Sequence, residues 1–500
     1  MKTTQATATA ILSVLLAVPG GLSAQTIPDH PDKLTYKEFS YKPPTAKEYR
    51  HVLKAGPVAY VAEDHELPLV SVTVTLRGGT HQNPEGKEGL AELTGYLLAR
   101  GGTKTRTAEE LEEELAFLAA NLASGYGDDR ATVSLNLLSK DLDAGLKILR
   151  EVMTEPRFQE DKLALRKEQI LADMKTRNDD SADIEARERA FLAYGEGYAF
   201  NRYITRASLD SIKRDELVAF HQRWFDPKGM IVAISGDVKS DVALRKLEET
   251  FSRWPLKPQT APPLPKPSHK MPPGLYIVDK DVNQGRVSVM LPGLVRTDPD
   301  YFAAELMNDA LGGGGFSSRI VNRVRSDEGL AYSAGSTLAG GVWFPGIYRA
   351  SFQSKVRTCA YATQIVLEEM KKFIDGGGTD SELETSKARY IETLPRRFGT
   401  KAQTLGVLVD EEYTGRYQTD PNYFANYRAN VQKVTKADVS RAAARLLKGT
   451  PTILVVGKKE DLLNPDPKHP VKYPELAGGK VVDVPLRDPF TMKPVAPATK

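Results

Sequence analysis

The chain has 500 residues, enough for about two to four domains, and its 68 Lys and Arg nearly balance its 65 Asp and Glu, for a formal net charge of +3. Because this charge is small and is spread along the chain, nucleic acid is not expected as a partner. Hydrophobic residues make up 41% and charged residues 27%, a balance typical of folded globular domains that excludes a disordered or collagen-like chain.

The N-terminus has the pattern of a cleaved signal peptide. Lys2 precedes an apolar run that includes Leu12 and Leu16, and small residues follow it up to Ala24. A first core helix is the alternative, but the run gives way to an open segment that begins at Gln25. No other stretch approaches the roughly 18 consecutive apolar residues of a membrane span. We therefore expect residues 1–24 to be removed and the mature chain to be a soluble periplasmic protein without a membrane span.

Cys359 is the only cysteine of the chain, so neither an intrachain disulfide nor a thiolate zinc cluster is possible. The cleavage region also has no cysteine that would carry a lipid.

A proline-rich segment divides the chain. Eight prolines fall between Pro255 and Pro273, and this density favours an extended, semi-rigid backbone. We expect an N-terminal domain over residues 25–254, a linker over 255–273, a C-terminal domain over 274–465 and a tail over 466–500.

The two expected domains resemble each other. Strands are predicted at 69–76 and 285–291, and an offset of 213 residues places Glu92 on Glu305. Helix starts at 212–217 and 434–439 correspond at an offset of 222, and short apolar strands at 231–236 and 452–457 follow them. Similar offsets throughout predict an internal duplication.

Within the first half, strands and helices alternate. Thr107 and Glu110 form a capping box before a leucine stripe that predicts a helix ending at Gly125, and residues 132–137 alternate as a strand does. The acidic residues of the same segment lie mostly off this stripe and are interpreted as a solvated face; they are Glu109, Glu110, Glu112, Glu113 and Glu114. The predicted fold class is α+β, with two duplicated halves, each a mostly antiparallel sheet covered by helices on one face.

Several motifs together resemble the pitrilysin or insulinase family of zinc peptidases, which includes mitochondrial processing peptidase. They are Leu67-Pro68 through Gly79, then Gly86-Lys-Glu-Gly-Leu-Ala91, Gly101-Gly-Thr103, Gly312 through Arg319, and Arg325 through Tyr332. The resemblance extends over nearly all of the mature chain and implies the clamshell fold of that family.

The resemblance also identifies a motif that is missing. In the family, His-x-x-Glu-His on a helix holds zinc and supplies the general base. The matching positions here are Glu92, Gly95 and Tyr96, and the third ligand falls at Asp173, with an accessory Glu position at Arg166. Each of these metal-site positions is changed, so we expect no metal and no catalytic residue on this chain alone.

Other catalytic chemistries lack support in the sequence. The seven histidines are too far apart in sequence for two of them to share a helical face, and a zinc site built from distant residues remains an alternative without a motif. No G-x-S-x-G is present, and Cys359 lacks the surroundings of a cysteine protease nucleophile.

By resemblance, Arg325 and Tyr332 match the substrate-binding Arg/Tyr pair of the family. A guanidinium can hold peptide carbonyls, and a phenol can donate to the oxyanion of the transition state. The alternative is an Arg in a surface ion pair and a Tyr in a core. Gly312, Gly313, Gly314 and Gly315 form a helix C-cap and loop, or a loop that handles substrate as in the non-catalytic subunit of mitochondrial processing peptidase.

In some members of this family one chain bears the zinc site and a second chain has lost it but keeps the Arg/Tyr pair, and this sequence resembles the second chain. The resemblance implies that this chain is an exported, non-catalytic, substrate-binding subunit. Its partner would carry His-x-x-Glu-His and the zinc, and the two chains together would degrade peptides or unfolded segments. The alternative is a stand-alone peptide-binding or scaffold protein, comparable to the core proteins of the respiratory cytochrome complex.

Overall fold

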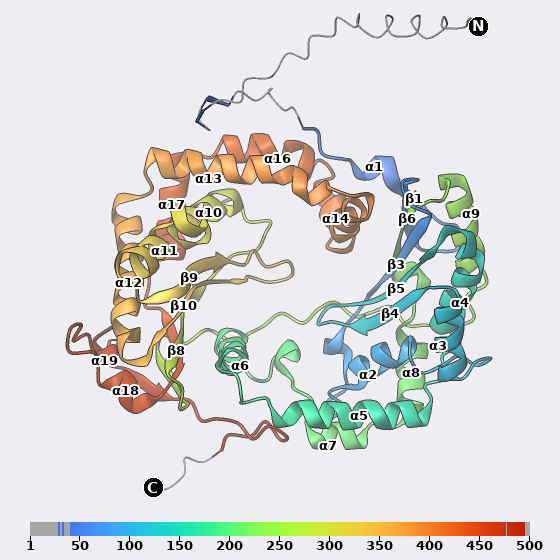
Figure 1. Cartoon of the computed structure of the whole chain (residues 1–500), viewed down its shortest axis with the longest axis horizontal. Helices are drawn as coiled ribbons and strands as arrows, with labels where there is room; N and C mark the ends of the chain where they lie inside the picture. The colour runs from blue at the N-terminus through green and yellow to red at the C-terminus, as the bar shows by residue number, and fades with distance from the viewer. Residues whose placement is uncertain (1–28, 31–32, 35–40, 477, 496–500) are drawn as a thin grey trace, which may run out of the picture. The chain divides into compact units, whose positions relative to one another are not determined.

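The computed structural model describes residues 29–30, 33–34, 41–476 and 478–495 (Figure 1). The expected signal peptide therefore lies outside the described residues. The chain divides into a short unit, residues 1–42, in which Lys33 pairs with Asp29 at 2.7 Å, and a large unit, residues 43–500. None of the helices in the described ranges is both long enough and apolar enough to cross a membrane.

The first half of the large unit forms a six-stranded sheet in the order β1-β2-β6-β3-β5-β4. Its strands are antiparallel except for the parallel pair β2 and β6. Alternating valines of β3 are buried against the helices, which is why this segment forms a central strand. The strands are β1 (Arg50–Val52), β2 (Val58–Glu63), β3 (Leu69–Arg77), β4 (Asn121–Tyr126), β5 (Arg130–Leu138) and β6 (Met230–Gly236).

The second half repeats this sheet in the order β12-β7-β11-β8-β10-β9. Here β7 is parallel to both β11 and β12, and the other pairs are antiparallel. Read from β2 to β4 in the first sheet and from β7 to β9 in the second, the strands have the same order and the same parallel or antiparallel pairing. This correspondence confirms the duplication. The strands of the second sheet are β7 (Gly274–Asp279), β8 (Gln284–Pro292), β9 (Ala331–Leu338), β10 (Ile347–Lys355), β11 (Thr452–Gly457) and β12 (Val481–Asp483), the last supplied by the tail.

Helices of each half cover its sheet, so the predicted α+β class with mostly antiparallel sheets is confirmed (Figure 1). In the first half they are α1 (Ala46–Tyr49), α2 (Leu90–Leu98), α3 (Ala108–Phe117), α4 (Leu142–Thr154), α5 (Glu160–Lys175), α7 (Arg206–Ser211), α8 (Arg214–Trp224) and α9 (Ser240–Phe251). The helices of the second half, apart from α14, are α10 (Tyr301–Asn308), α11 (Arg319–Val321), α12 (Cys359–Gly376), α13 (Asp380–Thr393), α15 (Arg416–Thr419), α16 (Tyr423–Gln432), α17 (Lys436–Leu446), α18 (Lys459–Leu463) and α19 (Tyr473–Leu476).

Two helices cross between the halves. In α14 (Lys401–Tyr413), Leu405 and Leu408 pack in one buried cluster with Tyr60 and Ile231 of the first sheet. Conversely, α6 (Ser181–Tyr194) packs in a cluster with strands β7, β8 and β11 of the second sheet. The second face of each sheet therefore receives one helix from the other half, a feature that the sequence pattern did not predict.

The helix expected from Thr107 to Gly125 is wrong in its second part. The Thr107 hydroxyl does accept from the Glu110 N–H as a cap, but α3 ends at Phe117 and Ala119 adopts φ 48°. Leu122 instead lies in β4 with its side chain in the core. Its spacing fits both the helical stripe and the alternation of Leu122, Ser124 and Tyr126, and pairing with β5 decides between them.

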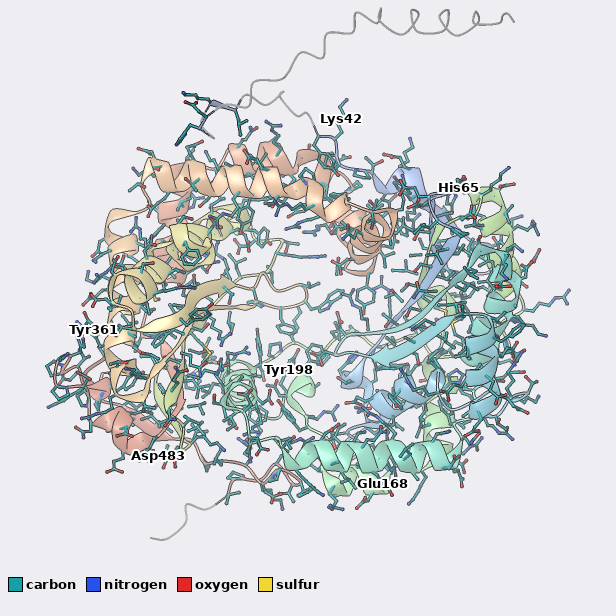
Figure 2. The ribbon with its side chains drawn as sticks, viewed as in Figure 1. Lys42, His65, Glu168, Tyr198, Tyr361 and Asp483 are labelled. Atoms are coloured by element: carbon teal, nitrogen blue, oxygen red, sulfur yellow. The ribbon has the colours of Figure 1, made fainter. Side chains whose placement is uncertain are left out.

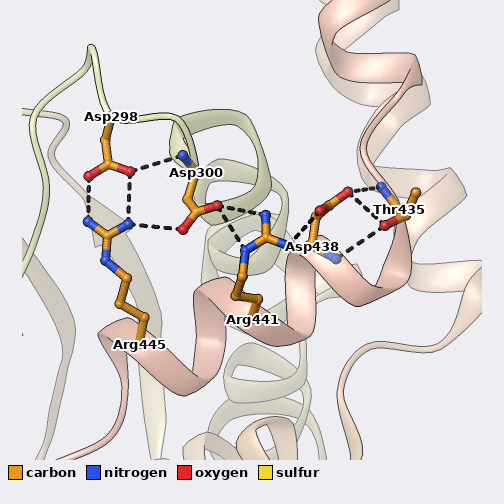
Figure 3. Close-up of polar contacts among 6 residues, drawn as sticks. All are labelled: Asp298, Asp300, Thr435, Asp438, Arg441 and Arg445. Carbon is orange, nitrogen blue, oxygen red and sulfur yellow. Dashed lines mark hydrogen bonds and ion pairs between the residues drawn. The ribbon is translucent and has the colours of Figure 1, made fainter.

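A polar cluster fixes α17 to the turn before α10 (Figure 3). Arg445 and Arg441 both bond the Asp300 carboxylate, at 2.9 and 2.7 Å, and Arg445 also pairs with Asp298. Asp438 accepts from the Thr435 N–H and hydroxyl at the start of the helix. Hydrogen bonds from Arg445 hold the pKa of Asp298 below its ordinary value.

Residues 255–273 contain no helix or strand, as the proline content indicates. The segment is nevertheless tied to the first half. The hydroxyl of Tyr198, which lies just after α6 (Figure 2), donates to the Pro265 carbonyl at 2.9 Å. The Gln259 N–H donates to the Arg223 carbonyl at 2.7 Å. The position of the domain boundary stays a prediction.

Candidate functional site

Helix α2 carries the three positions that would hold the zinc motif, and hydrogen bonds occupy its first turn. The Asn83 amide oxygen accepts from the Ala91 N–H at 2.7 Å, and its nitrogen donates to the Glu92 carboxylate at 3.0 Å. Burial raises the pKa of Glu92 despite this bond. Glu92 is thus a hydrogen-bonded carboxylate of the helix start.

Gly95, at the position of the general base, lies where α2 comes close to the backbone of β4. A Cβ at Gly95 would lie 2.7 Å from the Tyr126 backbone nitrogen and 2.9 Å from the Gly125 carbonyl carbon. The Ser124 hydroxyl, which donates to the Gly95 carbonyl, also accepts from the Ala99 N–H and joins the helix to the strand. The helix therefore has no room for a glutamate at this position.

Tyr96, at the second histidine position, is in contact with two cations. The guanidinium carbon of Arg100 lies 4.6 Å from the centre of the Tyr96 ring, and that of Arg166 on α5 lies 4.2 Å from it. Asp173, the expected third-ligand position, is exposed on α5. The structure thus brings Tyr96 and Arg166 together.

These residues do not fit a zinc ion. Tyr96 and Gly95 replace an imidazole and a carboxylate, and Arg166 places a positive charge where a cation would bind. Among the residues that the structure describes, no group of three or more His, Cys, Asp or Glu side chains is placed to hold a metal. The buried His221 bonds the Met153 carbonyl at 2.8 Å, and burial lowers its pKa to about 4. A step through zinc on this chain has no support.

The second set of predicted site residues lies in the C-terminal half. Arg325 is in a π-helical turn, Asn322–Asp327, and Tyr332 is the second residue of β9. The guanidinium carbon of Arg325 lies 4.6 Å from the centre of the Tyr332 ring and 4.5 Å from that of Phe316. Tyr332 is 85% exposed and Phe316 66% exposed, so the alternative of a core tyrosine is wrong.

The glycine run places Phe316 in this cluster. Gly312 and Gly313 continue α10 as a π-helical turn, and Gly315, at φ 64°, begins a short 3-10 turn that contains Phe316. A Cβ at Gly312 would lie 2.7 Å from the Ser336 nitrogen of β9, so only glycine allows this approach. Residues 312–315 therefore link a π-helical turn to a 3-10 turn, and this path brings an aromatic side chain onto Arg325.

Sequence reasoning missed Phe316 and Arg100. Phe316 directly follows the glycine run, and Arg100 follows Tyr96 by four residues, the spacing that places two side chains on one helical face. Both signals were available in the sequence. Neither residue belongs to a metal or nucleophile pattern, however, so a search for catalytic motifs does not find them.

Two family models match this chain. Residues 58–196 match the family described as Insulinase (Peptidase family M16), and residues 211–390 match the Peptidase M16 inactive domain. A relative named non-peptidase homolog YmxG, from Helicobacter pylori, is 27% identical over 72% of this chain and 82% of its own length. An uncharacterized zinc protease of Streptomyces coelicolor is 24% identical over 77% of this chain and 83% of its own.

Solved structures share the fold. A peptidase M16 inactive domain from Pseudomonas fluorescens superposes with a TM-score of 0.70 at 23% identity and covers 82% of this chain and 97% of its own. The periplasmic protease PqqL of Escherichia coli has a TM-score of 0.69 at 16% identity, over 88% of this chain and 49% of its own. At these identities the likeness establishes the fold alone.

Proposed function

Because the chain belongs to the insulinase family of peptidases, peptidase family M16, and lacks its zinc motif, we propose that it is the non-catalytic, substrate-binding subunit of a two-chain zinc peptidase. The observation that carries the proposal is the exposed stack of Phe316, Arg325 and Tyr332 in the second half, together with a position in the first half that has no room for the catalytic glutamate. The partner is a family member that carries His-x-x-Glu-His.

The stack suits a role in assisting a reaction on another chain. Stacking holds the Arg325 guanidinium in place while its N–H groups stay available for peptide carbonyls. The Tyr332 ring is fixed by the same contact, and its exposed hydroxyl can donate to an oxyanion. Large aromatic side chains left in water, such as Phe316, are typical of surfaces that become covered by a ligand or partner.

Peptide binding is supported by the sheet edges. In the described part of the chain, β4 pairs only with β5 and β9 only with β10. An extended peptide can add to such an edge through backbone hydrogen bonds. Export to the periplasm is part of the proposal and is supported by the apolar N-terminal run and by the fold shared with the periplasmic PqqL.

The test is reconstitution with zinc-bearing family members from the same cell. The mixture should have a higher peptidase activity than either the chain or its partner alone. The complex should elute as one species in size-exclusion chromatography. A partner that is equally active alone would refute the subunit role. A chain that binds peptides but never raises the activity of any family member would point to the stand-alone binding protein.

Two variants locate the contribution within the complex. Tyr332→Phe keeps the ring over Arg325 and removes only the hydroxyl, so we expect kcat to fall by about 10²- to 10³-fold with a smaller change in KM. Arg325→Gln should weaken both substrate binding and turnover, because a carbonyl clamp acts on the bound peptide before reaction. Both variants should still assemble, and wild-type kinetics in the double variant would show that the stack is structural.

A further inference from the structure

A cavity of about 450 Å³ is lined by Tyr96 and Arg166, two of the positions that correspond to the metal site of the family. It lies between α2, α3, α5 and the start of β4. Its walls combine an apolar surface, which includes Leu97, Leu115 and Leu122, with three cationic side chains and one acid. The charged lining residues are Arg100, Lys162, Arg166 and Glu112.

The positive charge of this cavity is concentrated on two arginines. Lys162 is paired with Glu109 at 2.7 Å. Arg100 and Arg166, in contrast, both lie over the Tyr96 ring, and the structure gives neither an ion pair with a carboxylate of the described residues. Arg166 donates one hydrogen bond, 3.1 Å, to the neutral Gln169. Two guanidinium groups that share one ring repel each other, and an anion bound in the cavity that both of them line relieves this repulsion.

The geometry also determines which anion fits. Stacking uses the face of a guanidinium and leaves the N–H groups at its edge free to form two parallel bonds to a planar carboxylate. The leucine side chains of the cavity favour a ligand that bears an apolar group next to that carboxylate. An inorganic anion would leave the apolar wall uncovered.

We propose that this cavity binds the carboxylate of a peptide, so that Arg100 and Arg166, on either side of a former metal-ligand position, form an anion site. The C-terminal carboxylate is the expected source. Asn121 and Leu122, at the first residues of β4, line the cavity. A peptide that adds antiparallel to β4 ends beside these residues, so its C-terminus and last side chain enter the cavity. The inference rests on the proposed function only in taking a peptide as the ligand.

The experiment compares three pools of N-acetylated heptapeptides, randomised at the first six positions, binding to the full mature chain. The first pool ends in leucine with a free carboxylate, the second in leucine amide and the third in glutamate amide. We expect the free acid to bind about 10- to 100-fold more tightly than the leucine amide, the range of a charge-assisted hydrogen-bonded pair. The glutamate amide reports whether a side-chain carboxylate is accepted as well.

Variants locate the effect. Arg100→Gln and Arg166→Gln should each reduce the preference for the acid by about tenfold, and the double variant should abolish it while leaving binding of the amide unchanged. The matched control is Arg245→Gln on α9, an exposed arginine whose ion pair with Glu249 lies within its own helix. It should keep the full preference. Circular dichroism and the unfolding midpoint confirm that each variant is folded.

The outcomes separate the two proposals. Equal binding of acid and amide, binding of no pool, or a preference that survives the double variant would each overturn the anion site. The reconstituted peptidase is assayed in parallel with a substrate blocked at both ends, which cannot use the cavity. Activity on that substrate without an acid preference refutes the cavity alone, and an acid preference without activity in any mixture refutes the subunit role alone.

Discussion

Replacing Gly95 by alanine tests whether α2 has closed over the catalytic position. A methyl group at this site would lie 2.7 Å from the Tyr126 nitrogen, 2.8 Å from its Cδ2 atom and 2.9 Å from the Gly125 carbonyl carbon, all closer than van der Waals contact. Two of these three atoms belong to the backbone of β4, which is paired with β5 and cannot turn aside as a flexible side chain would.

Two opposing terms set the size of the effect. Alanine is favoured over glycine inside a helix by about 1 kcal/mol. Overpacking of a filled site costs about 1–3 kcal/mol. Gly406, inside α14, offers the matched control because a Cβ there meets no atom within 4 Å. We expect Gly406→Ala to stabilise by up to about 1 kcal/mol, and Gly95→Ala to be less stable than it by the overpacking term, about 1–3 kcal/mol.

The assay is urea unfolding followed by tryptophan fluorescence, with the midpoints of the two variants compared under one condition. Trp224 and Trp254 pack against the core that contains α2 and β4 and report on its unfolding. Equal gains in stability from Gly95→Ala and Gly406→Ala would show that α2 is not held against β4. That result would remove the steric argument against a catalytic glutamate.

Three further results are expected. A variant with the family's zinc ligands and base restored should not bind stoichiometric zinc in elemental analysis; its substitutions are Glu92→His, Gly95→Glu, Tyr96→His and Asp173→Glu. The reasons are that α2 has no room for a glutamate in place of Gly95 and that Asp173 lies exposed. One zinc per chain would contradict this expectation. Asp298→Asn should lower the free energy of unfolding by about 1 kcal/mol at pH 7. Because Arg445 lowers the pKa of Asp298 in the folded state, this loss relative to the wild type should be complete above the unfolded pKa of about 4 and should vanish as the pH falls through the folded pKa. Denaturation curves of both proteins over this pH range measure it. Burial raises the pKa of Cys359 to about 12, so iodoacetamide at pH 8 should label the thiol in urea and leave it unmodified in the native chain; rapid native labelling would place the thiol at the surface.

Much of the architecture follows from the sequence because the two halves repeat the same signals. The alternation of residues 69–76 predicts β3, and the capping box at Thr107 predicts the start of α3 correctly. The exchange of α6 and α14 is different in kind. Each helix buries its apolar side chains against strands that lie far away in the sequence, and local periodicity contains no information on which sheet a helix covers.

The candidate site was predictable in part, for a similar reason. Sequence matching finds that the metal ligands are replaced, and it finds the Arg325 and Tyr332 spacing. It cannot find that Gly95 is required by the approach of a strand, since that constraint comes from tertiary packing. Nor can spacing show that Arg166 is the residue of α5 that contacts Tyr96.

The duplication puts the contact between Tyr96 and Arg166 in context and predicts how many anion sites of this kind the chain has. Helices α5 and α13 begin at Glu160 and Asp380, an offset of 220 residues that places Arg166 on Ser386, and the offset of 213 places Tyr96 on Asp309. In the second half the corresponding contact is a hydrogen bond, 2.8 Å, from the Ser386 hydroxyl to the Asp309 carboxylate. In the second half the two side chains at this contact thus hydrogen-bond each other. In the first half the contact leaves the guanidinium groups of Arg100 and Arg166 without a carboxylate partner. Because the corresponding contact in the second half is already hydrogen-bonded, the duplication supplies no second copy of this anion site, and the acid-specific binding that depends on Arg100 and Arg166 should have a stoichiometry of one per chain.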